Sequence, residues 1–197
     1  TMRRKLYLFD FDGTLTNVDS LFDFLKFSFP SEYNRIFRKH FISFVLTKLK
    51  ITDAAQAKEA FIADFLQGKS RKELEQLAQA YFRAKKDVIL RDKAKKYVEA
   101  INNYHDKFIV SASVDIWLQP FADYFGCGLI CTQTEYDERD VFTGKFASEN
   151  CNYQQKKNRI EMEIDLTLYD EILAFGDTKG DAAMLSLATK PHFRFFE

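Results

Sequence analysis

The sequence has few cysteines and no long apolar run. Its 197 residues include only three Cys, at positions 127, 131 and 151. This small, odd number does not indicate a disulfide framework and favours a reducing compartment. Cys127 and Cys131 have no nearby Cys/His pair to complete a zinc site, so we interpret them as small core residues. No stretch of about 18 apolar residues occurs, and no membrane-spanning helix is expected.

Net charge is also absent. The 29 basic and 29 acidic residues cancel, which argues against nucleic acid as the main partner. The amino-terminal segment TMRRKLYLFD has basic residues before an apolar run. Asp10 ends that run after five residues, which is too short for the core of a signal peptide, so a cytoplasmic protein is expected.

The hydrophobic patterns predict an α/β protein with one interruption. A buried strand is expected at 5–9, and strands at 107–113, 128–133, 171–177 and 192–196 alternate with helices at 91–104, 114–125, 153–164 and 180–188. A β-hairpin is expected at 132–146. The pattern of residues 19–84 predicts helices and no strand. We therefore predict a doubly wound, Rossmann-like parallel sheet formed by 1–16 and 88–197, with an all-helical cap inserted at 17–87.

Polar residues follow four of the predicted strands, in the segments FDFDGT, VSAS, LICTQT and AFGDTKGD. Ligands of open α/β sheets bind beyond the carboxyl ends of the strands. Three of these segments carry the residue types that a phosphate and metal site needs. The polar strand ends therefore predict the position of the site.

Asp10 and Asp12 lie two residues apart where the first strand ends. Both carboxylates stay ionised together if a cation joins them, and Mg²⁺ binds one or two carboxylates, waters and a substrate phosphate. Gly13 allows the backbone to approach an anion closely. A calcium loop is excluded because TLTNV follows Gly13, without further ligands at alternate positions. An ordinary turn remains the alternative reading of this stretch alone.

The segment DFDGTLT resembles the first motif of the haloacid dehalogenase (HAD) superfamily of phosphotransferases. FIVSAS resembles the second motif and points to Ser111. CNYQQKKNRI resembles the third and points to Lys156, with Lys157 as the alternative. LAFGDTKGDAAML resembles the fourth and points to Asp177 and Asp181. The four motifs come in the family's order and extend over the whole chain.

The resemblance implies a role for each of these residues. Asp10 is the expected nucleophile, which forms an aspartyl-phosphate, and Asp12 the general acid and base. Mg²⁺ is the expected cofactor, held by Asp10, Asp177 and the main-chain carbonyl of Asp12. Asp181 is a second ligand, or orients Lys156 or a metal-bound water. The expected phosphate-binding residues are Gly13, Thr14, Ser111, Ala112 and Lys156.

The predicted cap resembles that of the phosphoserine-phosphatase-like branch, subfamily IB with a helical C1 cap. Those relatives carry a Gly before the lysine helix, whereas this chain has Asn152 and Tyr153 there. Their Arg-containing cap segment, which binds the substrate carboxylate, has no counterpart in this chain. Asp19 falls where they carry a Glu that binds the substrate amine. It is a candidate for substrate recognition, although the N-cap of the following helix is the reading we prefer.

The sequence thus predicts a Mg²⁺-dependent phosphomonoester hydrolase for a small-molecule phosphate. The phenylalanines of the cap are mostly interpreted as helix-packing core. The segment RIFRKHFISFVLTKLK sets basic beside aromatic residues, which raises a lipid-phosphate phosphatase at a membrane surface as an alternative. Phosphotransfer to an acceptor other than water and a non-catalytic phosphate-binding protein are further alternatives. The physiological substrate and the oligomeric state are left open.

Overall fold

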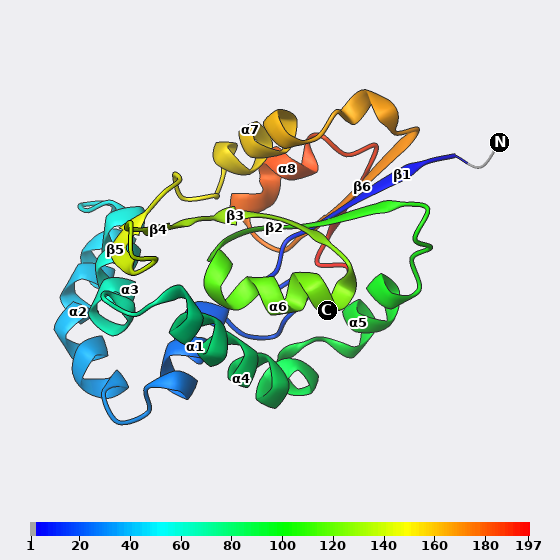
Figure 1. Cartoon of the computed structure of the whole chain (residues 1–197). Coiled ribbons are helices and arrows are strands. Elements are labelled where there is room, and N and C mark those ends of the chain that lie inside the picture. Colours follow the sequence, from blue (N-terminus) through cyan, green and yellow to red (C-terminus); the bar gives the residue numbers. More distant parts are fainter. Residues whose placement is uncertain (1–2) are drawn as a thin grey trace.

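The computed structural model describes residues 3–197, so residues 1–2 of the predicted amino-terminal segment lie outside the description. A five-stranded sheet has the order β3-β2-β1-β6-β7 with every neighbouring pair parallel (Figure 1). Its strands are β1 (Lys5–Phe9), β2 (Asp106–Val114), β3 (Gly128–Thr132), β6 (Glu171–Gly176) and β7 (Lys190–Phe193). This arrangement confirms the predicted doubly wound parallel sheet.

Helices cover both faces of the sheet. Successive strand residues point to opposite sides, and in β1 both sets of side chains are apolar. Leu6 and Leu8 of β1 share one apolar cluster with Ile160 of α7 (Gln154–Glu163) and Met184 of α8 (Ala182–Leu185). Tyr7 and Phe9 belong to the cluster on the other face, which includes α5 (Asp92–Glu99) and α6 (Asp115–Phe125). Continuous apolar strands are typical of a sheet that is buried on both faces.

Four helices lie between β1 and α5: α1 (Ser20–Ser28), α2 (Tyr33–Lys48), α3 (Ala54–Leu66) and α4 (Arg71–Ile89). Asp19, Asp53 and Ser70 cap α1, α3 and α4 by accepting hydrogen bonds from main-chain N–H groups of the first turn. The chain enters and leaves this block at one place. Thr16 forms an antiparallel bridge with Leu90, and the Arg91 N–H donates to the Leu15 carbonyl at 2.8 Å.

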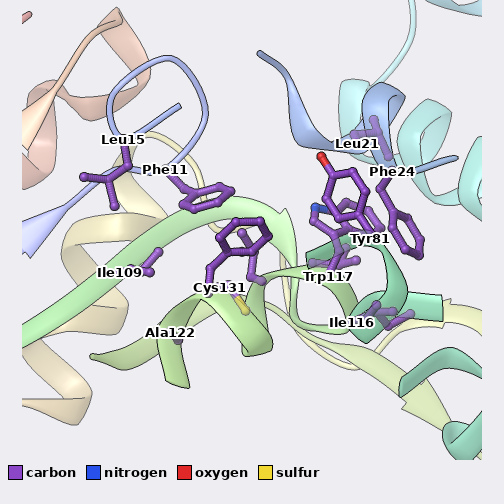
Figure 2. Packing of buried hydrophobic residues seen from close by; sticks show 14 of the residues in the cluster. Phe11, Leu15, Leu21, Phe24, Tyr81, Ile109, Ile116, Trp117, Ala122 and Cys131 are labelled. Atoms are coloured by element: carbon purple, nitrogen blue, oxygen red, sulfur yellow. The ribbon is translucent and has the colours of Figure 1, made fainter. Parts of the chain in front are cut away.

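The helical block shares one apolar core with the sheet. Figure 2 shows Phe24 of α1 and Tyr81 of α4 facing Trp117 of α6. Phe24 stacks on Trp117 with ring centroids 5.0 Å apart, and Tyr81 meets Phe121 of α6 at 6.2 Å. All four of these side chains are fully buried. The block is therefore held against the sheet layer by aromatic packing as well as by its two connections.

The hairpin of β4 (Thr134–Tyr136) and β5 (Phe142–Phe146) packs against the helical block at α3 and at the turn between α3 and α4. The Gly68 N–H donates to the Phe142 carbonyl, and the Phe142 N–H donates to the Lys69 carbonyl, both at 2.9 Å. The Phe146 N–H donates to Glu59 of α3. The sequence predicted this hairpin but not its docking on the α3–α4 turn.

Several predicted elements differ in length from those observed. The helix predicted over 91–104 ends at Glu99, and the last strand covers 190–193 instead of 192–196. The helix predicted over 180–188 consists of a 3₁₀ turn, Lys179–Asp181, followed by the short α8. Across residues 3–197, no helix combines the length and the apolar character that crossing a membrane requires.

Candidate active site

The polar ends of β1, β2 and β6 meet at one cavity of about 540 Å³. The helical block and the loop before α7 complete its wall. The cavity is lined by the predicted residues Asp10, Asp12, Gly13, Asp19, Ser111, Ala112, Lys156, Asp177 and Asp181, together with Asn17, Val18, Leu21, Ala54, Lys58, Ser113, Asn150, Asn152 and Thr178. Residues separated by up to 171 positions along the chain thus face one space.

Asp10 directly follows β1, and its main-chain N–H donates to the Phe175 carbonyl of β6. The chain then turns tightly, because the N–H groups of residues 14, 15 and 16 all donate to the Phe11 carbonyl. This turn brings the Thr14 hydroxyl to 3.0 Å from the Asp10 carboxylate. Gly13 has φ +79°, and a Cβ there would collide with the Asp177 carboxylate. A glycine is therefore required where the β1 loop passes Asp177.

Lys156, in the first turn of α7, is the motif lysine that reaches the site. Its ammonium donates to Asp10 and to Asp181, each at 2.6 Å, and its side chain is 2% exposed. Burial lowers the pKa of Lys156, but the two carboxylates more than offset this effect, so that its pKa lies above the usual value. Lys156 is therefore a fixed positive charge, buried beside the expected nucleophile.

The acidic side chains can be tested as a site for Mg²⁺. Oxygen atoms of Asp10, Asp177 and Asp181 lie within 4.8 Å of one another. Burial raises the pKa of Asp10 to about 8, although the Lys156 ammonium acts in the opposite direction. A divalent cation bound here would favour the ionised form of Asp10, and all three carboxyl groups offer the oxygen ligands that Mg²⁺ prefers. The residues therefore fit the expected cofactor.

Asp181 differs from the other two carboxylates because its oxygens already have protein partners. One accepts from Lys156, and the other accepts from the main-chain N–H groups of Asp177 and Thr178 at 3.0 and 3.1 Å. It also closes a capping box with Thr178. This geometry favours the second of its two predicted roles, in which Asp181 orients Lys156 and the loop that carries Asp177.

Asp12 has different hydrogen-bond partners from Asp10, although both line the cavity. Its carboxylate accepts from the Ser113 hydroxyl at 2.5 Å and from the main-chain N–H of Ser20 at 2.7 Å. The Ser20 hydroxyl in turn lies 3.3 Å from Ser113 and accepts from the Trp117 indole N–H. Asp12 is thus oriented jointly by β2 and by the first turn of α1.

The end of β2 brings Ser111 and Ala112 into the cavity. The Ser111 hydroxyl is buried and accepts from the Ser113 N–H at 3.0 Å. The Ala112 carbonyl accepts from the Thr132 hydroxyl. These contacts fix the loop that the resemblance assigns to phosphate binding.

Sequence reasoning missed Lys58, a lysine of α3 in the helical block. Its ammonium donates to the Ala112 carbonyl at 2.5 Å and to the Asn150 side chain. Burial lowers the pKa of Lys58 to about 8, although Asp12 and Asp19 pull it upward. The sequence indicated only that Lys58 lies within a predicted helix, in the segment TDAAQAKEAFIADFLQ. Lys58 therefore adds a positive group to the cavity from the helical block.

Asp19 lines the cavity and also serves as a helix cap. Its carboxylate accepts from the Leu21 N–H at 3.0 Å, which is the N-cap contact that we preferred. Tyr153, where the phosphoserine-phosphatase-like relatives have a nearby Gly, adopts φ +49° and ψ −126° at the N-cap of α7. The missing glycine is thus replaced by a tyrosine in a backbone conformation that favours glycine.

The chain is similar to several known proteins. The model of the haloacid dehalogenase-like hydrolase family matches residues 7–186. Protein CicA of Caulobacter vibrioides is 30% identical over 203 aligned positions, covering 97% of this chain and 86% of CicA. A protein of unknown function from Bordetella pertussis Tohama I has a TM-score of 0.80 at 24% identity, covering 96% of this chain and 89% of that one.

Phosphoserine phosphatases share the fold as well. A substrate-bound phosphoserine phosphatase complex has a TM-score of 0.66 at 17% identity, and the similarity covers 98% of this chain and 87% of that one. At identities this low, the structural similarity shows a shared fold only. The family match, which spans most of the chain, confirms the predicted resemblance and identifies an enzyme family. The chain belongs to the haloacid dehalogenase-like hydrolases.

Proposed function

We propose that this protein is a Mg²⁺-dependent phosphatase that hydrolyses a small phosphomonoester through an aspartyl-phosphate on Asp10. The observation that carries the proposal is the contact of the buried Lys156 with Asp10 at 2.6 Å, in the cavity that Asp12 and Asp177 also line. A carboxylate held beside a fixed ammonium is a positioned nucleophile for an anionic phosphoryl group. Residues 17–87 are proposed as the cap, supported by the paired connections at Thr16 and Leu90.

In the first step an oxygen of Asp10 bonds to phosphorus, and the bond from phosphorus to the leaving oxygen breaks. Asp12 gives its proton to that oxygen. In the second step water attacks phosphorus, Asp12 takes the proton of the water, and the bond to Asp10 breaks. The products are the alcohol and inorganic phosphate, and Asp12 is protonated again for the next turnover.

Lys156 and the loop of Ser111 and Ala112 would hold the phosphoryl oxygens during both steps. Thr14 keeps the Asp10 carboxylate in its orientation. Asp10, Asp177 and the Asp12 carbonyl would hold Mg²⁺, which when bound offsets the charge between the nucleophile and the incoming anion. Asp181 maintains Lys156 in reach of Asp10.

The substrate class is proposed from the cavity and from the structural neighbours. The cavity is lined by groups of both charges from the helical block, Asp19 and Lys58. Neighbours include phosphoserine phosphatases and a cytosolic 5′-nucleotidase IIIB bound to cytidine, which has a TM-score of 0.58. Phosphoserine, nucleoside monophosphates and other metabolite phosphates, together with lipid phosphates, form the panel to be screened for turnover.

The proposal is tested with p-nitrophenyl phosphate and Mg²⁺. Wild-type protein should release nitrophenol, excess chelator should abolish the release, and added Mg²⁺ should restore it. Asp10→Asn should be inactive while it keeps the wild-type circular dichroism spectrum. Radiolabelled phosphate from a suitable substrate should remain on acid-quenched wild-type protein and not on Asp10→Asn. Full activity of Asp10→Asn, or of the chelated enzyme, would contradict the mechanism.

A further inference from the structure

Helix α2 has two faces of different character. The inner face packs on α3, where the rings of Phe37, His40 and Phe44 surround Phe61 at centroid distances of 6.2, 5.5 and 5.1 Å. The outer face follows the helical spacing of three and four residues through Arg35, Arg38, Phe41, Ile42, Val45, Lys48 and Leu49. We call these seven residues the outer stripe.

The apolar members of the outer stripe face solvent. Ile42 is 70% exposed, Leu49 63% and Phe41 54%, and Ile51 in the following turn is 66% exposed. Most other phenylalanines of the helical block are buried or pack against the core. Figure 1 shows α2 at the outer edge of the block, on the side away from the sheet. The inner face already supplies the packing that holds α2, so the fold does not need the outer apolar residues.

The segment that contains the outer stripe, residues 33–52, carries charge of one sign, and Glu32 and Asp53 flank it directly. Residues 33–52 contain five Lys and Arg and no Asp or Glu, a formal charge of +5 with His neutral. Lys39 pairs with Asp64 of α3. The remaining four, Arg35, Arg38, Lys48 and Lys50, are exposed and make no ion pair within residues 3–197. A protein of zero net charge thus concentrates unpaired positive charge beside exposed apolar side chains.

We infer that the outer stripe of α2 docks the protein on an anionic lipid surface. Basic residues beside bulky apolar side chains on one helical face match the headgroups and the acyl boundary of such a surface together. A symmetric contact between two copies through this face would bring two clusters of like charge together, which disfavours it. The complementary charge therefore selects lipid as the occupant.

The docking face adjoins, along the chain, a residue that lines the cavity. Ala54, at the start of α3, lines the cavity, and Ile51 precedes it by three residues. Three residues of chain span at most about 11 Å. A surface that receives Ile51 therefore lies near a residue of the cavity lining. Docking does not depend on the proposed hydrolysis, and the two are tested separately.

The test uses flotation of the protein with vesicles. Vesicles of equal parts phosphatidylglycerol and phosphatidylcholine should retain the wild-type protein at low salt, and phosphatidylcholine vesicles should not. High salt should release it, because salt screens exposed charges. Lys48→Gln with Lys50→Gln should weaken retention roughly 25-fold, at about fivefold for each basic residue near the surface. Ile42→Ser should weaken retention through loss of apolar contact.

Matched control variants test whether retention by the vesicles depends on α2 in particular. Lys72→Gln with Lys93→Gln removes the same charge from α4 and α5, and Met162→Ser removes an exposed apolar side chain from α7; both should float like wild type. Unchanged thermal unfolding would show that each variant is folded. The inference is overturned if anionic vesicles fail to retain the wild-type protein, or if both sets of variants lose retention equally. It is also overturned if light scattering finds a dimer that Ile42→Ser dissociates.

Discussion

At the scale of single residues, the two aspartates that follow β1 have different surroundings although only Phe11 separates them. Asp10 contacts Lys156 and Thr14 and is buried. Asp12 contacts Ser113 and the main-chain N–H of Ser20. One environment fixes a carboxylate beside a cation, and the other holds a carboxylate between two hydrogen-bond donors. These surroundings are consistent with the distinct roles that we propose for the pair.

The role of Asp12 predicts a dependence on the leaving group. Asp12→Asn removes proton transfer, which contributes about 10²- to 10⁴-fold to a rate. The loss of kcat should be largest for alkyl phosphates, whose leaving oxygens need the proton, and small for p-nitrophenyl phosphate. Asp12→Glu, which retains the carboxyl group, is the comparison variant. An equal loss for both classes of substrate would argue against Asp12 as the general acid.

Lys58 predicts a pH dependence. Because burial lowers its pKa to about 8, the ammonium loses its proton above that pH, and attraction to an anionic substrate should weaken. We expect kcat/KM to fall about tenfold above pH 8, as for loss of a hydrogen bond to a charged group. In Lys58→Arg the side chain keeps its positive charge, so kcat/KM should not fall above pH 8. In Lys58→Met kcat/KM should be low at every pH. A fall of the same size in Lys58→Arg would assign the titration elsewhere.

The lowered pKa of Lys58 also determines how the free energy of unfolding changes with pH. The unfolded chain keeps the proton on Lys58 up to its ordinary pKa of 10.5, whereas the folded protein loses it from about 8. Between these values the unfolded state binds more protons, so this group makes the free energy of unfolding rise with pH. Comparison of urea unfolding of wild type and Lys58→Met across this range checks the sign.

At the scale of elements, α7 begins with a strained residue. Tyr153 has positive φ at the N-cap, and its side chain is 62% exposed. Tyr153→Gly should raise the free energy of unfolding by about 1 kcal/mol, because strained non-glycine backbone costs on the order of 1–3 kcal/mol. Tyr153→Ala loses the same side chain without relieving the backbone. Equal stability of the two variants, measured by denaturant unfolding, would contradict the strain.

The sequence predicted the elements that carry motifs and missed the contacts made across the fold. Asp10, Ser111, Lys156 and Asp177 were predicted from the resemblance of four short segments to the family motifs, and all four line one cavity. Lys58 was missed because its approach to the Ala112 carbonyl depends on how α3 sits against β2. The docking of the β4–β5 hairpin on residues 68–69 was missed for the same reason. Long-range packing, which local patterns do not encode, decides both.

At the scale of the whole molecule, the helical block and the sheet layer should unfold together. Phe24 and Tyr81 of the block are buried against α6, in one apolar cluster with residues of β1. Replacement of residues 17–87 by a short linker would expose Trp117 and Phe121, so the shortened chain should not fold stably. The intact chain should give one cooperative transition with coincident fluorescence and circular dichroism curves. A separately folded sheet layer, or two resolved transitions, would contradict this coupling.

The contact between Trp117 and the helical block also gives the protein an intrinsic optical sensor. Trp117 is the single tryptophan, is fully buried, stacks on Phe24 and donates its indole N–H to Ser20 beside Asp12. Its emission therefore comes from one known position, at the seam where α1 meets the sheet layer. If α1 lifts when a ligand enters, the indole meets water and its emission shifts to longer wavelength. Stopped-flow fluorescence of the unlabelled protein would then time this movement of α1 directly.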